Sequence, residues 1–177
     1  HFAGQPCDME RLSDLAKTYD FRIIEDASHA IGAKYNDYRV GSCIHSDITV
    51  FSFHPVKIIT SGEGGLATTN DSELCDKMKI LRSHGIDKTL NEDKDGAKKP
   101  WLYSQVKLGY NYRMTDVEAA LGESQLLRLD DYVSQRNQLA NRYNQYLCDL
   151  PIQLPANVPK TRSAFHLYTV KMENSVV

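Results

Sequence analysis

The chain has 177 residues, 41% hydrophobic and 25% charged, which is typical of a soluble globular protein with a core of its own. Its net charge is −2 with both signs interspersed, so the sequence offers no basic face for a nucleic acid or a membrane surface. No apolar run approaches the ~18 residues of a membrane-spanning helix, and no targeting signal opens the chain.

The first part of the chain predicts a strand, a helix and a second strand. Residues 1–7 contain glycine and proline and predict a strand end followed by a turn. Asp8 is a suitable helix cap, and apolar residues recur at helical spacing over 9–19. Residues 21–25 then predict a short apolar strand that ends at Asp26. Such units build parallel sheets, in which ligands lie beyond the carboxyl ends of the strands.

Asp26 stands at such a strand end, and His29 follows three residues later. Two interpretations are open: Asp26 caps a helix, or Asp26 and His29 face a bound heterocycle. Residues 32–40 place Asn36 and Asp37 between two tyrosines and predict a hairpin.

The central stretch, 48–65, has the sequence ITVFSFHPVKIITSGEGG. Its β-branched and aromatic start predicts a buried strand over 48–53, and Pro55 requires the chain to leave the sheet there. Lys57 therefore lies on the loop beyond a strand end, and the glycines after it allow this loop to fold tightly around a bound group. Lys57 is either a nucleophilic amine or a solvated loop lysine.

The next part of the chain predicts a short strand over 66–69 and a helix capped at Asn70 or Asp71 that runs to about residue 84. Residues 87–100 are strongly polar, so they form either a flap over the substrate or a solvated excursion.

The last third of the chain is mainly helical. Thr115 and Glu118 form a capping box that opens a helix at 116, and apolar residues keep helical spacing from Leu126 almost to Pro151. Three prolines then mark a linker, and a strand is predicted over 166–172.

This organisation predicts two parts: a large domain over 1–150, including a connecting helix, and a linker with the first strand of a small C-terminal domain over 151–177. Because the chain begins with His1 rather than Met, we expect a fragment of a longer protein.

Cysteine usage favours a reducing compartment. The four cysteines lie far apart and form no CxxC pair: Cys7, Cys43, Cys75 and Cys148. We therefore expect reduced thiols in a cytoplasmic protein. Cys43, His45 and Asp47 lack a fourth ligand at a familiar spacing, so no metal site is expected.

Five motifs together resemble the sugar aminotransferases of the DegT/DnrJ/StrS family, and they occur in the family's order: EDASHAIGA, GS, FSFHPVKIITSGEGGLATTND, LRSHGI and LGYNYRMTDVEAALG. The resemblance covers 1–172. It implies an α/β fold, the three-layer α/β/α large domain of pyridoxal-phosphate enzymes of fold type I, with the start of a small C-terminal domain.

The resemblance also implies roles for single residues. Lys57 matches the Schiff-base lysine, which then moves the proton during amino transfer. Asp26 matches the acid that pairs with the pyridine nitrogen and keeps it protonated. A relative with histidine at the lysine position performs a dehydration instead, so Lys57 implies amino transfer.

Three further residues match cofactor-binding positions. His29 matches a residue near the cofactor's 3′-oxygen, and Ser52 matches a hydroxyl that binds the phosphate. Asn111 matches an asparagine that reaches the phosphate in the neighbouring subunit, which implies a homodimer with shared active sites.

The roles of three other residues stay open. Arg113 meets a substrate anion or ties the dimer interface together, and we favour the interface. His54 is expected to shape the loop, while Glu63 either orients Lys57 or contacts the sugar.

The implied function is transfer of an amino group from L-glutamate to a 4-keto-6-deoxy nucleotide sugar, UDP-linked, in surface polysaccharide or nonulosonic acid biosynthesis, such as that of pseudaminic acid. The alternatives are a non-catalytic relative that keeps the fold for binding or regulation, and an aminotransferase for another keto sugar or a cyclitol. The family's amino-terminal phosphate-binding and ring-stacking residues have no match in this chain. We therefore expect the isolated fragment to bind the cofactor weakly or not at all.

Overall fold

The structure is a computed structural model that describes residues 1–87, 99, 101–156 and 158–172. The chain divides into two compact units, one formed by 1–70 with 116–177 and the other by 71–115. Residues 88–98 and 100, which include most of the predicted flap, lie outside the described residues. Within the described ranges, no helix is both long and apolar enough to cross a membrane.

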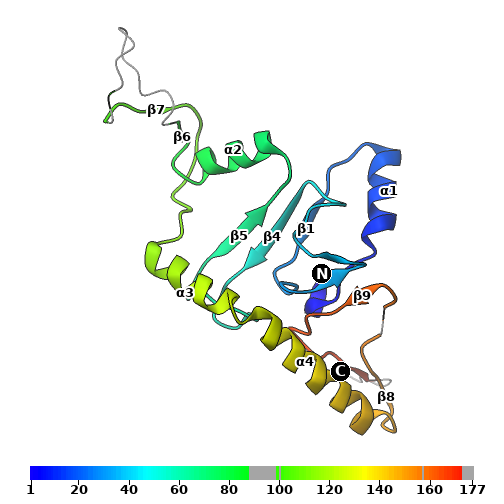
Figure 1. Cartoon of the computed structure of the whole chain (residues 1–177). Helices are drawn as coiled ribbons and strands as arrows, with labels where there is room; N and C mark the ends of the chain where they lie inside the picture. The colour runs from blue at the N-terminus through cyan, green and yellow to red at the C-terminus, as the bar shows by residue number, and fades with distance from the viewer. Residues whose placement is uncertain (88–98, 100, 157, 173–177) are drawn as a thin grey trace. The chain divides into compact units, whose positions relative to one another are not determined.

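The first unit is built around a three-stranded sheet in the order β1, β4, β5, whose strands lie side by side in Figure 1. Strand β1 (Ile24–Asp26) runs parallel to β4 (Ile48–Ser52), and β5 (Gly65–Thr68) runs antiparallel to β4. Because β1 and β4 are parallel, their carboxyl ends reach the same edge of the sheet. The α/β fold class expected from the sequence is confirmed.

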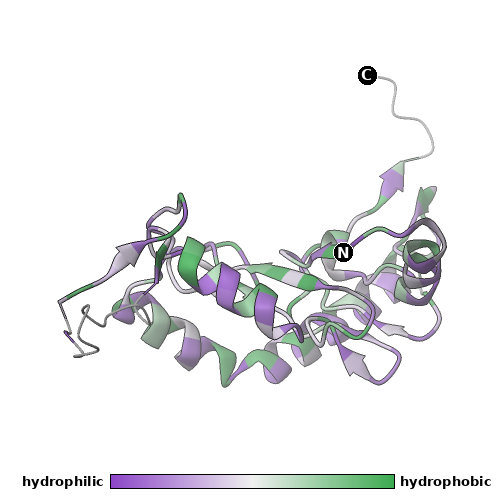
Figure 2. Ribbon diagram, turned by 90° about the horizontal axis from the view of Figure 1, so that it is seen from above, coloured by the Kyte–Doolittle hydropathy of each residue, from purple (hydrophilic) through white to green (hydrophobic). Residues whose placement is uncertain are grey.

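The N-terminal helix agrees with its sequence pattern, but the segment before it does not. Helix α1 (Met9–Tyr19) begins after Asp8, whose carboxylate accepts a hydrogen bond from the backbone N–H of Arg11. The strand end predicted over 1–7 is wrong, because this segment forms the short 3-10 helix η1 (Phe2–Gly4), in which Ala3 has a φ of 60°. Figure 2 shows hydrophobic and hydrophilic residues interspersed along the helices.

The helical pattern of the last third divides into two helices, α3 (Asp116–Leu126) and α4 (Leu129–Leu147). The break follows from Arg128, whose φ of −105° and ψ of 4° lie outside the helical region. The apolar spacing continues across the break, so spacing alone could not locate it.

Short strands complete the first unit. The predicted hairpin is confirmed as β2 (Lys34–Tyr35) and β3 (Tyr38–Arg39), and β9 (Thr161–Arg162) pairs with β2 from the far end of the chain. The strand predicted over 166–172 is limited to β10 (Lys171–Met172), which pairs with β8 (Ile152–Gln153).

The second unit, 71–115, contains helix α2 (Ser72–Leu81) and a two-stranded ladder. The side chain of Asp71 caps α2 by accepting hydrogen bonds from the backbone of Glu73 and Leu74. The ladder joins β6 (Ile86–Asp87) to β7 (Ser104–Gln105).

The core of the first unit lies where α4 packs against the turns after β1. It gathers nine buried residues from the two strand ends, α4 and the segment after β9: Ala27, Ala30, Ala33, Phe51, Ile58, Ile59, Leu129, Val133 and Ala164. A side chain at Gly32 would place its Cβ 2.8 Å from Val133 Cγ2 and 3.2 Å from Leu129 Cδ1. The small residues of this turn therefore allow α4 to approach closely.

This close packing can be tested with two glycine substitutions. Gly32 and Gly62 both have positive φ, 81° and 87°, but only Gly32 has neighbours within 4 Å of an added Cβ. We expect Gly32→Ala to lower the free energy of unfolding by about 2 kcal/mol more than Gly62→Ala, because both add backbone strain and only Gly32→Ala also overpacks the core. Denaturant unfolding measures the difference, and equal losses would contradict the packing.

Candidate active site

The turn after β1 presents Asp26 and His29 at the carboxyl edge of the sheet. Asp26 Oδ1 accepts a hydrogen bond from the backbone N–H of Ser28 at 3.0 Å, and no helix follows, so the helix-capping interpretation is wrong. Hydrogen bonds from Ser28 lower the pKa of Asp26, and the charges of Lys57 and of His29 in its protonated form lower it further. Asp26 is therefore a carboxylate at neutral pH.

His29 is held with one ring nitrogen as a hydrogen-bond acceptor. The backbone N–H of Ala3 donates to His29 Nδ1 at 3.3 Å. Burial lowers the pKa of His29, the positive charge of Lys57 lowers it further, and Asp26 acts in the opposite direction. The imidazole is therefore neutral at pH 7 and carries its proton on Nε2, which leaves Nε2–H as a donor.

Lys57 lies on a tightly folded loop after β4, as the sequence predicts. The carbonyl of Phe53 accepts hydrogen bonds from the Ser61 backbone and the Thr60 hydroxyl at 3.1 and 2.9 Å. Ile58 and Ile59, the two residues after Lys57, are buried in the core with exposed fractions of 6% and 1%. This anchoring fixes the backbone of Lys57, whose side chain is partly exposed.

The structure brings Lys57, Asp26 and His29 together. The charge of Lys57 changes the pKa of both Asp26 and His29, so the amine lies within electrostatic range of both groups. Asp26 and His29 line a cavity of about 200 Å³ together with His1, Phe2 and Ser28. An acid, an imidazole donor and a primary amine at one sheet edge are the groups that a pyridine aldehyde would require.

His166 is a member of this cluster that the sequence did not indicate. Its ring lies against His29, with 4.6 Å between the ring centroids and an interplanar angle of 43°. Burial lowers the pKa of His166 to about 4, and the positive charges of His29, Lys57 and Arg136 act in the same direction. A histidine within an apolar segment, SAFHLY, is the signal that could have marked it.

The two predicted phosphate ligands lie in different units. Ser52 ends β4, opposite Gly65, and its hydroxyl accepts a weak hydrogen bond from the His54 backbone at 3.5 Å. Asn111 belongs to the second unit, where it forms an isolated bridge with Ser83. Its contact with a neighbouring subunit stays a prediction, as does the phosphate contact of Ser52.

Two other polar residues of the Lys57 loop, His54 and Glu63, lie near each other. His54 Nε2 lies 3.8 Å from Glu63 Oε1, and both side chains are largely exposed. The backbone N–H of Val56 donates to His54 Nδ1 at 3.5 Å, in keeping with a loop-shaping role for His54.

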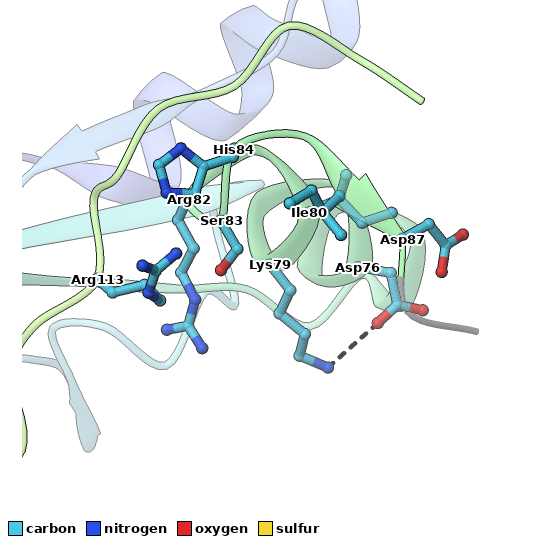
Figure 3. A pocket seen from close by; sticks show the side chains of 9 residues that line it. Asp76, Lys79, Ile80, Arg82, Ser83, His84, Asp87 and Arg113 are labelled. Atoms are coloured by element: carbon cyan, nitrogen blue, oxygen red, sulfur yellow. Dashed lines mark hydrogen bonds and ion pairs between the residues drawn. The ribbon is translucent and has the colours of Figure 1, made fainter. Parts of the chain in front are cut away.

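Arg113 lines a cavity of about 800 Å³ in the second unit. Figure 3 shows its guanidinium on the same side of this cavity as that of Arg82, whereas Lys79 points to Asp76. Lys79 Nζ and Asp76 Oδ1 form an ion pair at 3.1 Å. Whether Arg113 meets a substrate anion or an interface stays a prediction.

Cys43 and Asp47 have structural partners. The Cys43 thiol is buried against the Thr49 and Thr68 hydroxyls, and Asp47 Oδ1 accepts a hydrogen bond from Arg22 at 2.7 Å. Among the described residues, no group of three His, Cys, Asp or Glu side chains could hold a metal ion.

Comparison with known proteins identifies the family. The model of the DegT/DnrJ/EryC1/StrS aminotransferase family matches residues 1–177. The chain belongs to this family. It is 42% identical over 170 residues to the UDP-4-amino-4,6-dideoxy-N-acetyl-β-L-altrosamine transaminase of Campylobacter jejuni, and the match covers 96% of this chain and 42% of that protein.

Solved structures of family members have the same fold. Helicobacter pylori PseC, an aminotransferase of pseudaminic acid biosynthesis, superposes with a TM-score of 0.85 at 33% identity, over 97% of this chain and 44% of PseC. The putative sugar aminotransferase Spr1654 of Streptococcus pneumoniae, in its PLP form, gives a TM-score of 0.83 at 31% identity, over 97% of this chain and 46% of Spr1654. The chain thus spans less than half the length of the relatives it matches.

The electrostatic arrangement predicts opposite effects of two charge changes on His29. We expect Lys57→Met to raise the pKa of His29, because it removes a positive charge, and Asp26→Asn to lower it, because it removes a negative one. Histidine NMR titration of the cofactor-free protein measures both shifts, with His45 as the internal control. Shifts of the same sign in the two variants would contradict the arrangement.

Proposed function

We propose that the full-length protein is a pyridoxal-phosphate-dependent aminotransferase that transfers an amino group from L-glutamate to a 4-keto-6-deoxy nucleotide sugar. The observation that carries this proposal is the convergence of Lys57, Asp26 and His29 at one edge of the sheet. The names of family relatives support it: a transaminase of a UDP-linked amino sugar, and a sugar aminotransferase with PLP and PMP forms.

The residues of the chain fit the proposed cofactor. Pyridoxal phosphate, when bound, supplies an aldehyde and an electron-accepting ring. Asp26 is ionised and would hold the proton on the ring nitrogen, while His29 Nε2–H would donate to the 3′-oxygen. The Ser52 hydroxyl would bind the phosphate.

Lys57 would act twice. Its amine would hold the cofactor covalently through the aldehyde, with loss of water, and when free Nζ would carry the proton between the carbon of the substrate amine and the cofactor. The buried Ile58 and Ile59 hold the loop backbone, which keeps the Cα of Lys57 at this edge of the sheet.

The acceptor is proposed to be UDP-linked, and the products to enter surface polysaccharide or nonulosonic acid biosynthesis. The Campylobacter and Helicobacter relatives support this choice by name. We further propose a cytoplasmic homodimer in which Asn111 completes the phosphate site of the neighbouring subunit.

The assignment of Lys57 predicts a spectral change. Full-length protein mixed with pyridoxal phosphate should acquire the absorbance of a lysine-bound cofactor, and glutamate should convert it to the pyridoxamine form. We expect Lys57→Ala to abolish this absorbance, whereas Lys17→Ala, on the exposed face of α1, should keep it. Persistence of the band in Lys57→Ala would refute the assignment.

The acceptor is identified by assaying the same protein with glutamate against UDP-linked and dTDP-linked 3-keto and 4-keto sugars. Conversion of the cofactor by glutamate without turnover of any sugar would favour another ketone acceptor, such as a cyclitol. No conversion at all would favour a non-catalytic binding protein.

A shared active site predicts complementation between two inactive variants. A mixed dimer of Lys57→Ala and Asn111→Ala subunits has both defects in one site and neither in the other. Random mixing should therefore restore about a quarter of the wild-type activity, because half of the dimers are mixed and each has one intact site. Restoration of less than a few per cent would place Asn111 in its own subunit's site.

A further inference from the structure

The segment 163–167, which carries His166, is fixed to helix α4 on one side. The Arg136 guanidinium donates to the carbonyl oxygens of Phe165 and His166 at 3.1 and 3.3 Å. The Asn137 amide donates to the carbonyl oxygen of Ser163 at 3.0 Å. These bonds hold the backbone on both sides of Ala164, which is fully buried.

The same segment is fixed to the N-terminal segment on its other side. The backbone N–H of Ala164 donates to the Gly4 carbonyl at 2.9 Å, and that of Leu167 donates to the Ala3 carbonyl at 3.2 Å. A Cβ on Gly4 would lie 2.9 Å from His166 N, so the approach requires a glycine. Phe165 adopts a φ of 44°, a strained conformation that persists only where the surroundings impose it.

This anchoring directs the His166 ring against His29. The two centroids are 4.6 Å apart, and Phe2 also contacts His29, with 5.8 Å between centroids. With the Ala3 hydrogen bond to Nδ1, His29 therefore has three contacts that define the plane of its ring.

Among the residues that the structure describes, no hydrogen bond of its ring explains a histidine at position 166. Its Nδ1 is buried and has no hydrogen-bond partner among the described residues. An unpaired buried nitrogen is unfavourable for stability, and the ring is neutral at pH 7. Among the described residues, the ring contact that the structure shows for His166 is the one with His29.

We propose that His166 is a positioning residue of the cofactor site, whose ring contact holds the His29 imidazole so that Nε2–H is presented to a group bound beside Asp26. This inference rests on the proposed function, because it takes that group to be the 3′-oxygen of pyridoxal phosphate. His166 acts through His29 and needs no protonation of its own.

The test compares three variants of the full-length protein. His166→Leu removes the ring, His166→Phe keeps an aromatic ring without nitrogens, and His45→Leu removes a matched histidine. His45 is also half-buried against an aromatic ring, Tyr35 at 5.9 Å, and does not line the cavity of Asp26 and His29. The measurements are the dissociation constant of pyridoxal phosphate, the absorption spectrum of the bound cofactor and the melting temperature.

We expect His166→Leu to weaken cofactor binding about tenfold and to shift the spectrum, because one aromatic contact is worth about this factor. His45→Leu should change neither, and His166→Phe should bind within about twofold of wild type, since it keeps the ring contact. Equal binding by His166→Leu and His45→Leu would overturn the inference. So would equal weakening by His166→Leu and His166→Phe, because the ring contact would then not be what matters.

Failure of the inference differs from failure of the proposed function. If the wild-type protein itself neither binds pyridoxal phosphate nor acquires its absorbance, the proposed function is wrong. If the wild type binds and His166→Leu is unchanged, only the role of His166 is wrong.

Discussion

The packing of α4 against the small residues after β1 is the constraint on which the first unit depends. Leu129 and Val133 lie where a side chain at Gly32 would be, and three buried alanines surround this contact. A larger residue in the turn would move α4 away, and with it the anchors of the segment 163–167. One helix thereby sets the positions of both histidines in the candidate site.

Parallel pairing of β1 and β4 accounts for the meeting of Asp26 and Lys57. Asp26 is in register with Val50, and the backbone N–H of Ala27 donates to the Val50 carbonyl at 2.9 Å. Asp26 therefore ends β1 at the same edge of the sheet at which β4 ends and the Lys57 loop begins. The buried Ile58 and Ile59 keep this loop from moving away into solvent.

Two histidines of the site are neutral and a third is charged. Burial and the nearby amine lower the pKa of His29 and His166, beside the carboxylate of Asp26. Burial acts in the same direction on His1, which also lines the cavity, but hydrogen bonds with Cys7 and Glu25 outweigh it and raise the pKa of His1 to about 9, so this imidazolium pairs with Glu25. Next to Asp26, Glu25 points to the opposite side of β1 and is buried. Burial alone would raise the pKa of Glu25, but hydrogen bonds from His1, Ser46 and Thr49 outweigh burial and lower it. Strand β1 thus carries two carboxylates. Glu25 is hydrogen-bonded inside the protein, and Asp26 lines the cavity.

The sequence by itself determined the local elements and the residue types of the site. The capped helices, the hairpin at Asn36 and the strand before Lys57 follow from short-range periodicity, turn residues and proline, which act within a few residues. Five motifs in order were sufficient to indicate the family.

Only the tertiary structure decided which residues meet. His166 is 137 positions from His29 in the chain, and no local pattern encodes a contact made by packing against α4. The break at Arg128 and the 3-10 helix at Phe2–Gly4 likewise leave the spacing of apolar residues unchanged, so periodicity could not locate them.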